Sequence, residues 1–214
     1  MSTPNVQLNN CCVVYVSAFD GSVVVDNVTP TLRNNYIQQC DNEHIKRQRY
    51  CVWRLLDYAL RQQLGFGVDS FEFTLDASGK WRSNCGVQFS LSHCSSAVAV
   101  ALSNNAVGVD IEYALRQIDH KLAGRILSDG ELAIYNALPI EKRNNYLLET
   151  WCSKESIYKQ SCETRSFEAN SIVVGQGVRI SHVKVRNGCY VVAVATEKEL
   201  DVSTKVVDLF DTLH

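Results

Sequence analysis

The sequence lacks the marks of several classes of protein. It has no uninterrupted apolar stretch of about 18 residues, which argues against a transmembrane helix. Only 3 of its 214 residues are proline and no segment has low complexity, so collagen-like and disordered classes are excluded. An excess of charge of either sign is also missing. The 21 basic and 23 acidic residues give a net charge of −2, and this balance predicts no nucleic-acid partner.

A signal for export is missing as well. The first residues, Met1 to Asn5, contain no basic segment followed by an apolar run, which predicts a cytoplasmic protein with no membrane partner. The 9 cysteines agree with this, because their number is odd, Cys11 and Cys12 are adjacent, and no Cys-x-x-Cys pair occurs. We therefore expect reduced thiols that act as small core residues.

The sequence does contain a mixture of strand and helix patterns. Residues 41–60 repeat apolar side chains at steps of three to four, which predicts an amphipathic helix. Residues 114–163 predict a mainly helical region with a break at Pro139. Apolar or alternating runs predict strands over residues 11–19, 71–75, 87–92, 97–102, 107–112, 171–180, 183–185 and 190–196.

This order of elements predicts the class α+β. It fits a pseudo-dimer of two similar α+β halves, each a small antiparallel sheet packed with helices. The predicted halves are residues 1–112 and 113–214. In the first half, two apolar runs flank an Asn-Asn turn, which predicts a β-hairpin of residues 97–102 with residues 107–112.

Asp110 and Glu112 form the first candidate site. At positions i and i+2 of a strand, their carboxylates emerge on one face, where Gly108 leaves room for a ligand or another backbone. Like charges so close together repel each other unless a cation lies between them. Oxygen ligands of this kind suit Mg²⁺, whereas the plain alternative is a solvated strand end.

Residues 150–159, Thr-Trp-Cys-Ser-Lys-Glu-Ser-Ile-Tyr-Lys, predict one helix. Glu155 and Lys159 share a face of it, whereas Lys154 points about 100° away. An ordinary surface salt bridge would explain the pair. A third carboxylate beside ammonium groups would instead complete a magnesium–pyrophosphate site.

Two further groups of residues are of the types that bind phosphate. The alternation of residues 87–92 puts Ser90 and Ser92 on one face and leaves His93 at the strand end, as a phosphate donor or a turn residue. Basic residues on the first helix and in the next turn form either a solvated face or a set of phosphate ligands. They are Lys46, Arg47, Arg49, Arg54 and Lys80.

Three motifs, in this order and at this spacing, resemble those of the 4′-phosphopantetheinyl transferases, specifically their Sfp-like two-halved class. They are Phe-Ser-Leu-Ser-His-Cys at residues 89–94, Val-Gly-Val-Asp-Ile-Glu at residues 107–112, and Trp-Cys-Ser-Lys-Glu-Ser-Ile-Tyr-Lys at residues 151–159. The resemblance covers residues 43–165 well. It implies a magnesium-dependent enzyme of the holo-[acyl-carrier-protein] synthase type. Such an enzyme transfers the 4′-phosphopantetheine arm of coenzyme A to a serine of an apo acyl or peptidyl carrier protein, and releases 3′,5′-ADP.

The resemblance also implies the residues of the site. The magnesium ligands correspond to Asp110, Glu112 and Glu155. Glu155 would also accept the serine proton, directly or through a water, and Lys159 would contact the pyrophosphate. The coenzyme A contacts correspond to Arg49, Lys80, Ser92, His93, Lys154 and Lys159.

Two positions depart from the family pattern. Trp81 stands where the family has a proline after its Gly-Lys pair, which alters the turn that carries Lys80. Cys94 stands where the family usually has a serine. The family places carrier docking beside the segment between the motif helices, here residues 122–146.

Other functions are open at this point. A module that binds coenzyme A or a carrier protein without chemistry is one alternative, although the three intact carboxylates argue against it. A metal-dependent phosphohydrolase is another, and it lacks a His/Asp cluster able to hold two metals. We expect a monomer, because two halves in one chain form the site that shorter family members build between subunits.

Overall fold

The computed structural model describes residues 11–26, 31–77, 79–161, 166–175, 177–197 and 200–210. The strands are β1 (Cys11–Ala18), β2 (Phe73–Leu75), β3 (Trp81–Ser83), β4 (Gln88–His93), β5 (Ala97–Ser103), β6 (Val107–Tyr113), β7 (Val178–Val185), β8 (Gly188–Thr196) and β9 (Asp201–Val206). The α-helices are α1 (Thr31–Gln38), α2 (Glu43–Leu64), α3 (Ala123–Ile126), α4 (Asp129–Ala137) and α5 (Ile140–Ser161). Short 3-10 helices lie at Val68–Ser70, His120–Leu122 and Ala169–Ser171.

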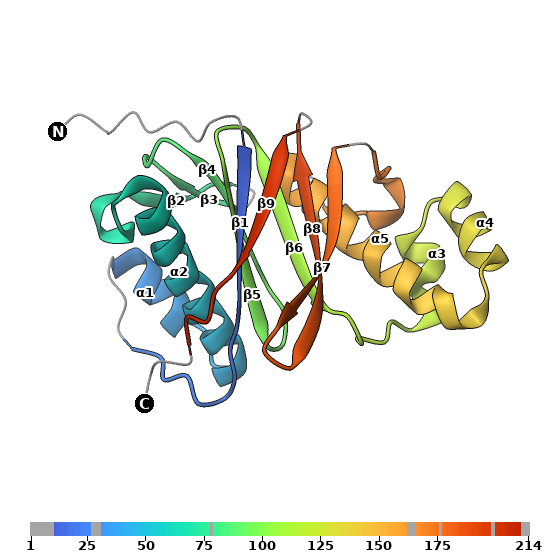
Figure 1. Cartoon of the computed structure of the whole chain (residues 1–214), viewed down its shortest axis with the longest axis horizontal. Coiled ribbons are helices and arrows are strands. Elements are labelled where there is room, and N and C mark those ends of the chain that lie inside the picture. The colour runs from blue at the N-terminus through green and yellow to red at the C-terminus, as the bar shows by residue number, and fades with distance from the viewer. Residues whose placement is uncertain are drawn as a thin grey trace.

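Two sheets lie face to face between two layers of helix (Figure 1). One sheet has the strand order β4-β5-β1-β9 and the other has the order β6-β8-β7, while β2 and β3 form a separate hairpin. Helix α2 packs on the outer face of the first sheet. Helix α5 packs on the outer face of the second sheet, with α3 and α4 beyond it. The fold is therefore a helix–sheet–sheet–helix sandwich.

Burial on both faces explains why β1 and β5 are continuously apolar. In β1, Val13 and Tyr15 belong to the core under α2, whereas Val14 and Val16 belong to the core between the sheets. In β5 the face toward the second sheet is made of Ala97, Ala99 and Ala101. Small side chains on that face allow the two sheets to pack closely.

The predicted class α+β is confirmed, with small sheets that are mainly antiparallel and packed with helices. The helix predicted over residues 41–60 is α2, which begins after the N-cap Asn42 and ends at Gly65, whose φ is 76°. The helical region predicted over residues 114–163 contains α3, α4 and α5, with a break between α4 and α5 at Pro139. Residues 162 and 163 lie outside the described residues.

The predicted hairpin of residues 97–102 with residues 107–112 is wrong. Strand β5 pairs with β4 and β1, whereas β6 pairs with β8 in the other sheet. The turn at residues 104–106 therefore carries the chain from one sheet to the other. The Asn-Asn signal marks a turn, but only the packing of the whole chain decides which strand pairs with which.

The C-terminal strands also differ from the prediction. Residues 171–175 form no strand; the strand expected over 171–180 begins at Val178 and continues through 183–185 as β7. Residue 176 lies outside the described residues. Strand β9, which the pattern does not predict, pairs in parallel with β1. Each large sheet thus contains a strand from each side of residue 112, and the division into halves at that position stays a prediction.

The described cysteines are free thiols, as predicted. The ones that act as small core residues are Cys12, Cys51, Cys85, Cys94 and Cys152. Cys162 lies outside the described residues. In the same part of the chain, no helix combines the length and the apolar character that crossing a membrane requires.

Candidate functional site

Strand β6 carries its functional side chains on the face toward α5. Val107, Val109 and Ile111 belong to the core between the sheets, so the alternating residues point to the other face. On that face Gly108 meets α5 so closely that an added Cβ would lie 1.9 Å from the carbonyl oxygen of Ser156. A glycine is therefore required where β6 and α5 cross, and this contact brings Asp110 to the helix.

Asp110, Lys159 and Ser92 form one hydrogen-bonded group between β4, β6 and α5. Lys159 Nζ lies 2.7 Å from Asp110 Oδ1 and 3.1 Å from Ser92 Oγ. Ser92 Oγ donates to the same Asp110 Oδ1 at 2.8 Å. The structure thus brings together three of the predicted residues, contributed by all three sequence motifs.

Ser90 and Ser92 also join the two sheets. The backbone N–H of Val109 donates to Ser90 Oγ at 3.0 Å, and that of Ile111 donates to Ser92 Oγ at 3.3 Å. Strands β4 and β6 are edges of different sheets, so these hydroxyls satisfy backbone groups that have no partner strand. The two serines lie on one face of β4, as the alternation predicts, and they hold β6, the strand of Asp110, beside β4.

The second oxygen of Asp110 is in an unusual state. Oδ2 is buried and has no hydrogen-bond partner among the described residues. A buried polar atom without a partner is destabilising unless a ligand satisfies it. The other members of this group are hydrogen-bonded to one another through Asp110 Oδ1, so Oδ2 is the point where a further ligand would bind.

Glu112 is half-buried on the same face, and its Oε1 forms an ion pair with Arg116. Burial raises the pKa of Glu112 to about 7, and the charge of Asp110 acts in the same direction against that of Arg116. Burial and the charge of Asp110 therefore disfavour the ionised form of Glu112. A cation placed between the two would reverse this effect.

Glu155 and Lys159 complete the group from α5. Lys159 Nζ lies 3.9 Å from Glu155 Oε2, so the predicted pair on one face of the helix is confirmed. Burial raises the pKa of Glu155, although Lys159 opposes this. Burial also favours the neutral amine of Lys159, but the charges of Asp110 and Glu155 outweigh it and raise the pKa of Lys159. Lys159 therefore stays charged.

His93 and Arg49 lie beside this group. His93 has an exposed surface, yet enough protein surrounds its ring that desolvation lowers its pKa to about 4, and the charges of Lys159 and Arg49 act in the same direction. The imidazole is therefore neutral at pH 7. Arg49 Nη1 donates to the carbonyl oxygen of Tyr36 at 2.8 Å, and its guanidinium lies 4.2 Å from the centre of the Tyr36 ring.

Lys154 is not brought into this group. Its side chain is fully buried, and Nζ lies 2.9 Å from the carbonyl oxygen of Ile126 and 2.5 Å from Glu131 Oε2. Glu131 also accepts from the backbone N–H of Ser128, as part of the capping box of α4. The ammonium of Lys154 thus faces α3 and α4 on another side of α5.

Lys80 contacts the site through the main chain. Its Nζ lies 2.6 Å from the carbonyl oxygen of Lys159 and 3.3 Å from that of Val107. Of the basic residues on α2, Lys46 pairs with Glu43, and Arg47 donates to the carbonyl oxygen of Val23. The predicted basic residues therefore do not converge on one point.

Two residues of this site are not among those predicted from the sequence. Arg116 follows the Asp-x-Glu motif by four positions and pairs with Glu112, but no local pattern identifies it. Cys152 lies on α5, and burial together with the charges of Asp110 and Glu112 raises the pKa of its thiol. Its place on the site face follows from its position three residues before Glu155, a spacing that was available in the sequence.

The described residues do not form a preassembled metal centre of three or more His, Cys, Asp or Glu side chains. Mg²⁺ needs less than this, because it usually takes one or two carboxylates, several waters and substrate phosphates. The free oxygen of Asp110 and the neighbouring carboxylates of Glu112 and Glu155 fit such an ion. The donor set is therefore suited to a magnesium ion that arrives together with a phosphorylated ligand.

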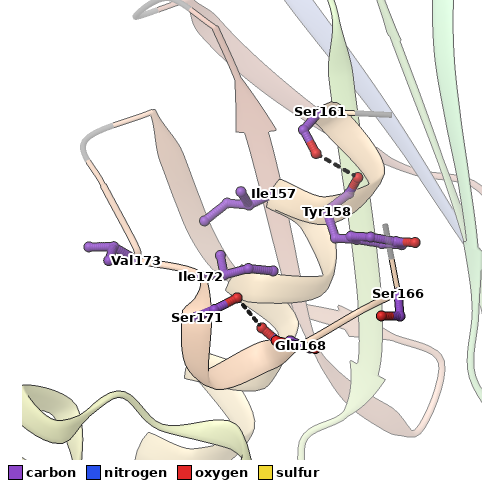
Figure 2. Close-up of a pocket in the computed structure, with 8 residues that line it drawn as sticks. All are labelled: Ile157, Tyr158, Ser161, Ser166, Glu168, Ser171, Ile172 and Val173. Atoms are coloured by element: carbon purple, nitrogen blue, oxygen red, sulfur yellow. Dashed lines mark hydrogen bonds between the residues drawn. The ribbon is translucent and has the colours of Figure 1, made fainter. Parts of the chain in front are cut away.

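A cavity of about 610 Å³ lies at the end of α5, apart from these carboxylates. Figure 2 shows its lining side chains, which come from α5 and from the segment after it. They are Ile157, Tyr158, Ser161, Ser166, Glu168, Ser171, Ile172 and Val173. Tyr158 also contacts Phe167, with ring centres 5.1 Å apart. Tyr158 thus lines this cavity.

A comparison with known protein families gives a match. The family model of the 4′-phosphopantetheinyl transferase superfamily matches residues 106–182, the stretch that contains β6, α3, α4, α5 and the start of β7. The resemblance to this superfamily is thereby confirmed for that stretch. No curated protein matches the chain.

Proposed function

We propose that this chain, with its phosphopantetheinyl transferase match over residues 106–182, transfers the 4′-phosphopantetheine arm of coenzyme A to a serine of an apo acyl or peptidyl carrier protein. The single observation that carries the proposal is the buried, unpartnered Oδ2 of Asp110 beside the ammonium of Lys159. An unsatisfied carboxylate oxygen next to a fixed positive charge is what a magnesium–diphosphate ligand requires.

In the proposed site, Asp110, Glu112 and Glu155 would hold Mg²⁺ together with the diphosphate of coenzyme A. When bound there, the ion supplies positive charge that stabilises the diphosphate and the leaving 3′,5′-ADP. Lys159 is already charged and hydrogen-bonded to Asp110, so it adds a second, preorganised positive charge at the phosphoryl oxygens. Asp110 and Ser92 keep this ammonium in position.

The proposed reaction moves one proton and one phosphoryl group. The serine hydroxyl of the carrier attacks the β-phosphorus of coenzyme A, and 3′,5′-ADP departs as the leaving group. Glu155 accepts the serine proton, directly or through a water; its raised pKa brings its basicity closer to neutral pH, where general bases work best. His93, neutral at pH 7, supplies one ring N–H toward the phosphates of the nucleotide end.

The carrier protein would dock on the surface of residues 122–146. Leu127 and Tyr135 are buried there, but Leu122, Ile134 and Ile140 are 38%, 54% and 66% exposed. Exposed apolar side chains on neighbouring segments favour a protein partner. We propose a monomeric, cytoplasmic enzyme of the Sfp-like class whose natural carrier is acyl or peptidyl.

Incubation with coenzyme A, Mg²⁺ and a panel of apo acyl and peptidyl carrier proteins tests the proposal. Intact-mass measurement should show that a carrier gains one phosphopantetheine group, and chelation of the metal should abolish the gain. If coenzyme A binds but no carrier gains mass, the chain is a binding module without chemistry and the proposed transfer is wrong.

A further inference from the structure

Hydrogen bonds tie the described residues around Lys80, whose side chain reaches the junction of β6 and α5. The side chain of Asp76 accepts from the backbone N–H of Lys80 at 3.0 Å and from Arg82 Nε at 2.8 Å. Gly79 adopts a φ of 81°, which closes the turn. Behind it, Trp81 packs edge-on against Trp53, with ring centres 4.9 Å apart. These contacts anchor the main chain at Lys80 and at the residues that follow it.

The ammonium of Lys80 joins three elements. It donates to the carbonyl oxygen of Lys159, in the last turn of α5, and to that of Val107, at the start of β6. The last four carbonyls of a helix have no partner within the helix and carry partial negative charge. A cation at this point therefore satisfies the helix end and ties it to the strand of Asp110.

Lys80 binds the carbonyl oxygen of Lys159, the same residue whose side-chain ammonium contacts Asp110 in the proposed site. Lys159 Nζ lies 2.7 Å from Asp110 Oδ1, so the position of its main chain sets the position of that contact. Gly108 permits the close approach of β6 and α5, and Lys80 bridges the same two elements from outside. Both of these contacts of the Lys80 ammonium are made to main-chain carbonyl oxygens.

We propose that Lys80 is a positioning residue: it holds the last turn of α5 on β6 and so fixes Lys159 against Asp110, in place of the nucleotide contact that the sequence resemblance implies. This inference rests on the proposed transfer of phosphopantetheine. It agrees with the departure at Trp81, whose ring anchors the turn in the core.

The test separates the two roles by kinetics. Lys80→Met should lower kcat by about 10- to 100-fold, since a small misplacement of a catalytic group has effects of this size, while the KM for coenzyme A changes by less than about twofold. The preference for coenzyme A over 3′-dephospho-coenzyme A should stay as in the unmodified protein. Lys80→Arg should restore part of kcat, because guanidinium can donate to both carbonyls. Lys184→Met, which removes an exposed lysine of β7 outside the proposed site and the proposed docking surface, is the matched control and should change neither constant.

A direct nucleotide contact gives the opposite result. If Lys80→Met raises the KM for coenzyme A tenfold or more, leaves kcat unchanged and abolishes the preference over the 3′-dephospho compound, the proposal is overturned.

Hydrogen exchange of the backbone amides at residues 157–161 gives a readout that does not need activity. Exchange there should be faster in Lys80→Met than in Lys184→Met, even if the proposed transfer fails, and equal rates would also overturn the proposal. If Lys80→Met does not fold, Lys80→Gln, which keeps one donor, takes its place in both measurements.

Discussion

Lys154 and Lys159 lie on the same helix but in opposite situations. Lys154 is fully buried, and its ion pair with Glu131 is part of a network in which both groups have further hydrogen bonds. Lys159 is 28% exposed, and its partner Asp110 keeps one buried oxygen without a hydrogen bond. The two ion pairs of α5 therefore differ in their role. A satisfied ion pair fixes the structure, whereas an ion pair with an unsatisfied oxygen is ready to bind something else.

The largest effect is expected from removing the charge of Asp110. Asp110→Asn keeps the shape of the side chain and an acceptor for Lys159, but it lowers the affinity for a cation, so transfer should fall by about 10³-fold or more. Binding of Mn²⁺ in the presence of coenzyme A, followed by electron paramagnetic resonance, should weaken in parallel. A variant with full activity would show that Asp110 is not a ligand.

Breaking the other ion pair should affect stability instead. Lys154→Met leaves the partly buried Glu131 without its cation, which should lower the free energy of unfolding by about 3–5 kcal/mol in urea. The double variant Lys154→Met with Glu131→Met should recover much of this loss, since it removes the stranded charge. A folded Lys154→Met protein of normal stability with a raised KM for coenzyme A would instead support the coenzyme A contact implied by the resemblance.

The Lys154–Glu131 pair should also be visible in the acid response. Burial would raise the pKa of Glu131, but its hydrogen bonds with Lys154 and Ser128 outweigh burial and lower it below 4.5. A lowered folded pKa stabilises the protein above 4.5, and this contribution disappears as the pH falls through the folded value. Glu131→Gln should therefore flatten the acid branch of the stability curve measured by urea unfolding. An unchanged slope would contradict the assigned direction.

The smallest effect is expected at an exposed pair between α5 and β7. His182 Nε2 lies 3.0 Å from Glu149 Oε1, and these side chains are 48% and 28% exposed. Such surface pairs contribute about 0–1 kcal/mol, so Glu149→Gln should change unfolding by less than about 1 kcal/mol and leave transfer unchanged. A larger loss in either measurement would place Glu149 in the network of the site.

Local sequence patterns were sufficient to predict which side chains of β4, β6 and α5 share a face. The alternation of β6 and the glycine at position 108 predict that Asp110 and Glu112 share the face on which another backbone approaches closely. The helical spacing of Glu155 and Lys159 predicts their common face, and the shared face of Ser90 and Ser92 follows from period two in β4.

Long side chains and strand partners could not be predicted in this way. The ammonium groups of Lys80 and Lys154 bind carbonyl oxygens far away in sequence, so their roles depend on tertiary packing. The same holds for the partners of β5 and β6, which a turn signal between them cannot identify. The family match covers Val107 and Lys159, the two residues that Lys80 contacts, whereas Lys80 itself lies outside the matched residues 106–182.

The parallel pairing of β9 with β1 has a consequence for the time course of folding. Cys11 pairs with Asp201, so β1 gains its outer neighbour β9 from a segment that lies far from it in the sequence. Contacts between such distant segments form slowly, and until then one edge of β1 can pair with strands of other molecules. We therefore expect refolding to be limited by the arrival of β9 and to lose yield at high protein concentration, long after α2 and α5 have formed.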